Sequence, residues 1–175
     1  MFKPDWVKFI WNLQTDHRRF SPDLTKLDIR VGESADVKSF YETMASSFRT
    51  ERAWGPLAFE RVEECQRWAD DVTEGRDTLF LVLEDGKRIV GGSLLCTDRE
   101  SQRHLVSGVF LVEEYRCRGE GVALLAKSLD VLAEKEFPQA SVMTRSNVTA
   151  AKYLYPKFGA HQEKLDEPIS LKQVA

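Results

Sequence analysis

The sequence of 175 residues lacks a long apolar run and an excess of basic charge. No uninterrupted apolar run is longer than the one from Leu79 to Leu83, whereas a membrane-spanning helix needs about 20 apolar residues. Lys and Arg number 25 against 28 Asp and Glu, which gives a net charge of −3. The strongly basic surface that is typical of nucleic-acid-binding domains is therefore not expected. We expect neither a membrane nor a nucleic acid as a partner.

Cysteine and histidine are also scarce. The three cysteines, Cys65, Cys96 and Cys117, form no CxxC pair, which argues against a disulfide framework and favours a reducing, cytoplasmic compartment. The three histidines lie far apart and no HExxH motif occurs, so we expect no metal site. The remaining composition, 42% hydrophobic and 30% charged, is ordinary for a globular protein.

The N-terminal segment is rich in aromatic residues. Four apolar side chains occur at the i, i+3, i+4 and i+7 spacing of a helix: Trp6, Phe9, Ile10 and Leu13. We therefore predict an N-terminal aromatic helical extension over residues 1–22, followed by a domain over residues 23–175. The helix is expected to pack on that domain, with docking on a partner or on a second copy as the alternative.

Beyond residue 23, hydrophobic periodicity predicts alternating strands and helices. The expected elements are a strand over 27–31, helices over 34–48 and 58–73, strands over 78–83, 88–96 and 104–112, a helix ending at 137, a strand over 140–144, a helix ending at 158 and a strand over 161–171. This order predicts one α/β domain.

The most informative segment covers residues 109–125, VFLVEEYRCRGEGVALL. A strand is expected to run through a short glycine loop into a helix, whose first N–H groups lack internal partners and attract anions. Gly119 and Gly121 allow the backbone to come close to a bulky ligand, and Arg116 and Arg118 add positive charge. The loop therefore predicts a phosphate or pyrophosphate site.

Three known loops can be compared with this segment. The P-loop motif GxxxxGK[ST] is absent, and the dinucleotide motif GxGxxG fails at its third glycine, where Leu124 stands. The run Arg116-x-x-Gly119-x-Gly121 has the form [RQ]xxGx[GA]. It resembles the acetyl-CoA loop of the GCN5-related N-acetyltransferases, the GNAT family.

A second segment, NVTAAKYLYPKFGA over residues 147–160, is similar to the final helix of that family, N-x-x-A-x-x-LY-x-K-x-GF. The residues in register are Ala151, Leu154, Tyr155, Lys157 and Gly159. Asn147 lies one residue too far from Ala151, Ala160 replaces the usual aromatic residue, and Pro156 should kink the helix. The resemblance implies the GNAT fold, α/β (α+β), with a mixed, mostly antiparallel central sheet and helices on both faces.

The resemblance also implies an activity: transfer of an acetyl group from acetyl-CoA to a primary amine of a small molecule or peptide, by direct attack. Tyr155 matches the tyrosine that protonates the departing thiolate. The implied acetyl-CoA-binding residues are Leu111, Val112, Arg116, Cys117, Arg118, Gly119, Glu120, Gly121, Val122 and Asn147. Glu51 and Trp54 are expected near the acceptor.

The sequence leaves alternatives for the general base, for Cys117 and for the class of protein. Glu113 is the candidate general base, with Glu51, His104 or a chain of water molecules as alternatives. Cys117 is either a reactive thiol at a helix N-terminus or simply a small residue in the loop. The alternative to an enzyme is a non-catalytic module that binds and senses acyl-CoA, and a homodimer is possible because relatives commonly form one.

Overall fold

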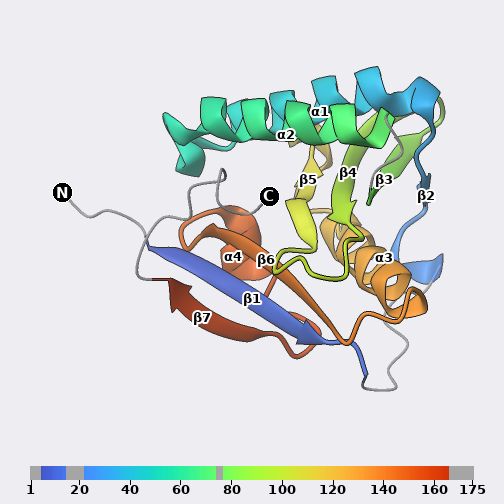
Figure 1. Cartoon of the computed structure of the whole chain (residues 1–175). Coiled ribbons are helices and arrows are strands. Elements are labelled where there is room, and N and C mark those ends of the chain that lie inside the picture. The colour runs from blue at the N-terminus through green and yellow to red at the C-terminus, as the bar shows by residue number, and fades with distance from the viewer. Residues whose placement is uncertain (1–4, 15–21, 74–76, 166–175) are drawn as a thin grey trace.

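Two antiparallel sheets form the framework of the computed structural model, which describes residues 5–14, 22–73 and 77–165 (Figure 1). The four-stranded sheet has the order β2-β3-β4-β5, with strands Asp28–Val31, Thr78–Asp85, Arg88–Cys96 and Leu105–Leu111. The three-stranded sheet has the order β6-β1-β7, with strands Gln139–Arg145, Trp6–Asn12 and His161–Leu165. The order of elements after residue 23 agrees with the prediction.

Helices cover both faces of the four-stranded sheet. The longer ones are α1 (Val37–Thr50), α2 (Leu57–Thr73) and α3 (Glu120–Glu134). Phe80 of β3 packs on Phe40 of α1 with ring centroids 4.5 Å apart, whereas Leu83 of β3 packs with Leu124 of α3. Because side chains of opposite parity point to opposite faces of a strand, α1 and α3 lie on opposite faces, as Figure 1 shows. The predicted α/β fold class is confirmed.

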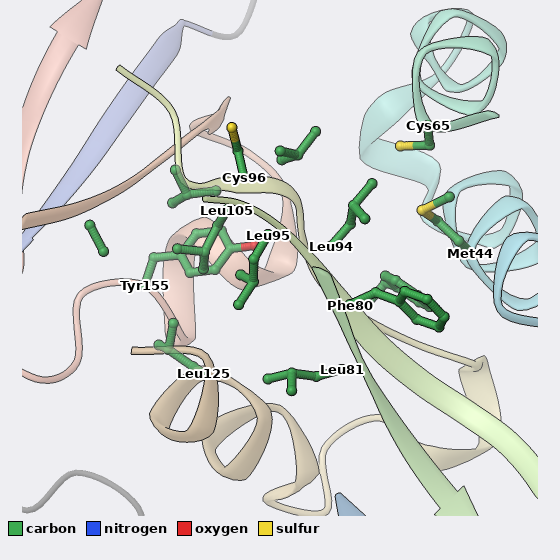
Figure 2. Packing of buried hydrophobic residues seen from close by; sticks show 14 of the residues in the cluster. Met44, Cys65, Phe80, Leu81, Leu94, Leu95, Cys96, Leu105, Leu125 and Tyr155 are labelled. Atoms are coloured by element: carbon green, nitrogen blue, oxygen red, sulfur yellow. The ribbon is translucent and has the colours of Figure 1, made fainter. Parts of the chain in front are cut away.

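The core fills the space between these layers. Figure 2 shows Met44 and Cys65 entering it from α1 and α2, and Leu125 from α3. Met44, Cys65 and Leu125 are all fully buried. None of the helices within the described ranges is long and apolar enough to cross a membrane.

The predicted N-terminal helix is wrong, because residues 6–12 form strand β1. The same segment also carries a period of two, and its odd-numbered side chains are the buried ones: Val7, Phe9, Trp11 and Leu13. Aromatic and β-branched residues favour a strand, and β1 pairs with β6 on one edge and β7 on the other. It is therefore part of the sheet and not an extension packed on the domain. Within the predicted extension, residues 1–4 and 15–21 lie outside the described residues.

The last predicted helix is much shorter than expected. Helix α4 covers only Thr149–Tyr153, and its N-cap is Val148. Pro156 explains the early end, because proline has no N–H to donate and restricts the residue before it to extended conformations. Of the last predicted strand, β7 ends at Leu165, and residues 166–171 lie outside the described residues.

The two sheets meet at one end of β5 and β6 and separate at the other. His104, just before β5, donates its N–H to the Ser141 carbonyl of β6 over 3.2 Å. Further along, residues 109–111 of β5 and 142–144 of β6 line one cavity. The strands therefore splay apart toward their C-terminal ends, and the candidate site lies in this gap.

Candidate functional site

A cavity of about 270 Å³ lies between the splayed strands. Its walls come from β5, β6, the end of α1, the glycine loop and the segment around α4. The polar and aromatic lining residues on which the chemistry depends are Glu51, Trp54, Arg61, Cys117 and Tyr155. Glu51 is the only carboxylate among the described lining residues.

The outer edge of β5 presents backbone groups to this cavity. Val112 donates its N–H to the Val90 carbonyl over 2.9 Å. Because N–H groups alternate along an antiparallel strand, the N–H of Leu111 points away from β4, on the side of the cavity. Of the two β5 residues implied in acetyl-CoA binding, Leu111 thus presents its N–H on the cavity side. Val112 does not, since its N–H is already bonded and its side chain is buried in a small cluster beside α3.

The glycine loop joins β5 to α3 at one end of the cavity. Gly119 is the N-cap of α3 and has a φ of +85°, in the left-handed region that side chains disfavour. A Cβ at Gly119 would meet nothing within 4 Å, so the space above this residue is open. Gly121 and Val122 line the cavity together with Gly119. Exposed N–H groups at a helix start beside open space suit an anion.

The two arginines of the loop differ in role. Arg116 lines the cavity, but its Nε donates to the Leu111 carbonyl over 3.2 Å and its Nη2 to Ser47 and Thr50 near the end of α1. This guanidinium therefore fastens the loop to α1 and holds β5. Arg118 is exposed, with its guanidinium 5.4 Å from the ring centroid of Tyr115. The Glu120 carboxylate accepts a hydrogen bond from the Thr25 hydroxyl and does not line the cavity.

Tyr155 lies in the turn after α4 and reaches into the same cavity. It is 3% exposed and packs against Phe9 and Trp11 of β1. Its hydroxyl oxygen accepts the Val109 N–H over 3.0 Å, so its own proton remains available for donation. Burial raises the pKa of Tyr155 to about 12. The phenol is therefore neutral and protonated at neutral pH.

Gly108 makes this contact possible. Its φ is +67°, and a Cβ at this position would lie 2.3 Å from the Tyr155 hydroxyl oxygen. Both the left-handed backbone and the close approach require glycine. Val109 has the same parity along β5 as Leu111, so its N–H also points away from β4, and it meets the Tyr155 hydroxyl there.

A buried ionic cluster under β5 was missed in the sequence. Arg61 and Arg103 each donate to the Glu64 carboxylate over 2.7 Å. The guanidinium of Arg61 also lies over the rings of Trp54 and Phe48, at 5.0 and 5.3 Å from their centroids. Charged residues on an amphipathic helix usually face solvent, so only the i, i+3 spacing of Arg61 and Glu64 was available as a signal.

The three candidate general bases lie in different parts of the structure. Glu51 is half-buried and lines the cavity. Glu113, in the short 3-10 helix Glu113–Tyr115, is exposed and lies outside the lining. His104 is at the closed end of β5, 9% exposed, and burial lowers its pKa. Of the three, only Glu51 shares the cavity with Tyr155.

Of the two remaining predicted site residues, Trp54 lines the cavity and Asn147 does not. Trp54 is 5% exposed and lines the cavity while packing on Phe48 and Trp6. Asn147 lies just beyond β6 and does not line the cavity, although its neighbours Val148 and Thr149 do. Its Oδ1 is buried without a hydrogen-bond partner among the described residues.

Comparison with known proteins adds two kinds of similarity. A family model described as the acetyltransferase (GNAT) family matches residues 37–160, well over half of the chain. No curated protein matches the chain.

Solved structures share the fold. An acetyltransferase from the GNAT family of Colwellia psychrerythraea has a TM-score of 0.62 at 14% identity, with 94% of this chain and 55% of that chain covered. A GCN5-related N-acetyltransferase from Ralstonia eutropha JMP134 has a TM-score of 0.59 at 18% identity, with 82% of this chain and 98% of that chain covered. A GCN5-related N-acetyltransferase from Sphaerobacter thermophilus has a TM-score of 0.58 at 20% identity, with 93% of this chain and 50% of that chain covered. The chain thus spans about half the length of the first and third of these structures.

Proposed function

Since the chain belongs to the acetyltransferase (GNAT) family, we propose that it transfers an acetyl group from acetyl-CoA to a primary amine by direct attack. The observation that carries the proposal is the shared cavity of the glycine loop and Tyr155. One end offers unbonded N–H groups to an anion, and the other holds a neutral phenol whose proton is free. An anion site and an acid in one cavity suit a thioester substrate.

The residues present fit acetyl-CoA. Residues 117–122 would hold its pyrophosphate, because Gly119 leaves open space at the start of α3. The Leu111 N–H faces the cavity side of β5 and is placed to polarise a carbonyl group, which is a large effect in a water-poor site. When bound, acetyl-CoA supplies the acetyl group as an activated thioester.

Tyr155 then acts as the general acid. Its hydroxyl, held by the Val109 N–H, gives its proton to the departing sulfur and regains one from water. General acid catalysis needs such a group within hydrogen-bond reach of the atom that it protonates. Glu51 attracts the acceptor's ammonium group and takes its proton, directly or through water, and Trp54 forms an apolar wall beside it. Glu113 has no part in this proposal, because it is exposed outside the cavity.

A calorimetric titration with acetyl-CoA tests the anion site. We expect Gly119→Glu to weaken binding by about tenfold or more, equal to about 1.4 kcal/mol, because its carboxylate repels the pyrophosphate. Gly119→Asn is the matched control, since asparagine tolerates left-handed backbone and carries no charge. Equal affinities of the two variants would contradict the site. Binding without transfer to any amine would favour a non-catalytic acyl-CoA-binding module.

Alkylation of cysteine gives an independent test. Cys117 is exposed and lines the cavity, whereas Cys65 and Cys96 are buried, and burial raises the pKa of the Cys65 thiol to about 11. Because the thiolate is the reactive form, we expect one equivalent of iodoacetamide to modify Cys117 first. Acetyl-CoA should slow this reaction, as peptide mass spectrometry can measure. An unchanged rate at saturating acetyl-CoA would place the ligand elsewhere.

A further inference from the structure

The ionic cluster of Arg61, Glu64 and Arg103 holds two guanidinium groups against one carboxylate. All three side chains are only 2–3% exposed. A buried ion is tolerated only where other charges or hydrogen bonds replace the lost water. Glu64 can neutralise one of the two cations, so the cluster keeps a surplus positive charge inside the protein.

Carbonyl groups of β5 hold this surplus charge. Arg103 donates to the Val106 carbonyl over 2.7 Å, and Arg61 donates to the Val106 and Ser107 carbonyls over 3.4 and 3.3 Å. The next residue is Gly108 with its left-handed backbone, and the one after it is Val109, whose N–H is bonded to Tyr155. The guanidinium groups are thus linked to the Tyr155 hydroxyl through four consecutive residues of one strand.

The surplus charge is also close to the reacting end of the cavity. Arg61 lines the cavity that Tyr155 lines, and the rings of Phe48 and Trp54 lie against its guanidinium. Aromatic groups keep water away, which strengthens a charge interaction. The positive charges of Arg61 and Arg103 oppose the rise that burial causes in the pKa of Tyr155, so the field of the cluster reaches the phenol.

We propose that Arg61 and Arg103, paired with Glu64, are positioning residues that fix β5 beneath Tyr155. They also keep one positive charge beside the thiolate that develops as the carbon–sulfur bond breaks. The inference rests on the proposed function. In the reaction the amine nitrogen forms a bond to the acetyl carbon, and the carbon–sulfur bond breaks. Its electron pair goes to sulfur, which receives the Tyr155 proton, and the amine loses a proton to Glu51 or water.

Steady-state kinetics of Arg61→Met and Arg103→Met test the proposal. Methionine keeps the length of the side chain but removes its charge and donors. We expect kcat to fall about tenfold, with KM for acetyl-CoA nearly unchanged, because the hydrogen bonds of both guanidinium groups go to Glu64 and β5 and not to the glycine loop. Arg67→Met is the matched control, since Arg67 lies on the same helix and is exposed. If both buried variants match the Arg67 variant in kcat, the proposal is wrong.

A spectroscopic measurement keeps the test independent of folding. The thiol of CoA is titrated by the ultraviolet absorbance of its thiolate, free and bound to the unaltered protein. We expect the bound thiol to ionise at a pH about one unit lower than the free thiol, a tenfold effect. Ionisation at an equal or higher pH would contradict the proposal that a surplus positive charge lies beside the sulfur. Arg103→Lys keeps that charge and should preserve the lower value. Failure of the proposed function looks different, since the unaltered protein would then bind no CoA or acetylate no amine.

Discussion

Tyr155→Phe is expected to lower kcat by about 10²- to 10⁴-fold, the range of general acid–base catalysis, while acetyl-CoA affinity stays nearly unchanged. The substitution removes one oxygen, which is the group that the Val109 N–H holds in the cavity. The departing sulfur must then be protonated by water, which the surrounding core largely excludes. Initial rates with a single amine acceptor, beside a binding titration, measure both quantities.

Two controls separate the acid role from damage to the fold. Tyr155→Phe leaves the Val109 N–H without its partner, which costs about 1–3 kcal/mol, so urea denaturation should show a moderate loss of stability. Tyr41→Phe also removes a hydroxyl, from half-buried Tyr41 of α1, and should keep full activity. A Tyr155→Phe variant with an unaltered rate would remove Tyr155 from the mechanism.

High pH provides a further check on the same residue. Burial raises the folded-state pKa of Tyr155 to about 12, above the value of about 10 expected in the unfolded chain. The folded protein therefore holds this proton more tightly, and the associated stability is present below pH 10 and lost as pH rises toward 12. The Tyr155→Phe variant should lose less stability over that interval.

Glu64→Gln is expected to destabilise the protein by about 3–5 kcal/mol, as removal of one partner from a buried ion pair typically does. The glutamine leaves Arg61 and Arg103, which are 2% and 3% exposed, without any counter-charge in their cluster. Two unbalanced cations then repel each other in a medium that screens them poorly. Urea denaturation followed by circular dichroism gives the free energy of unfolding.

Arg103→Met is the informative comparison for this prediction. Burial, and then the charge of Arg61, lower the pKa of Arg103, which indicates that its charge is held at a cost. Its loss leaves Arg61 and Glu64 as a neutral pair, so we expect a clearly smaller loss of stability than for Glu64→Gln. Similar losses for both variants would mean that the surplus charge is not what makes Glu64 essential.

Local patterns in the sequence were sufficient for part of the fold and site. The glycine loop is recognisable from three positions, Arg116, Gly119 and Gly121, and the structure places Gly119 at the start of α3 beside the cavity. The hydrophobic periodicity after residue 23 gave the correct order of strands and helices. Family membership can be predicted from such local signals, because they are recognisable without knowing which distant segments are in contact.

The missed features depend on contacts between distant parts of the chain. The segment around Trp6 and Phe9 carries both a helical and a strand period, and only pairing with β6 and β7 decides between them. From the sequence alone, Arg61 and Arg103 are expected to face solvent, whereas the structure places the Glu64 carboxylate between them. Glu113 follows β5 in sequence, yet the short helix after the strand directs it to solvent. Tertiary packing overrides local preference in each case.

The central place of β1 in its sheet has a consequence for synthesis on the ribosome. Trp6 pairs with Arg145 on one side and Leu165 on the other, so both partners are translated long after β1. Throughout that interval an aromatic strand has two open edges, the arrangement that promotes pairing with foreign chains. Contacts between such distant segments also slow folding. Aggregation of the nascent chain, and its relief by chaperones that shield β1, should therefore limit the yield of soluble protein.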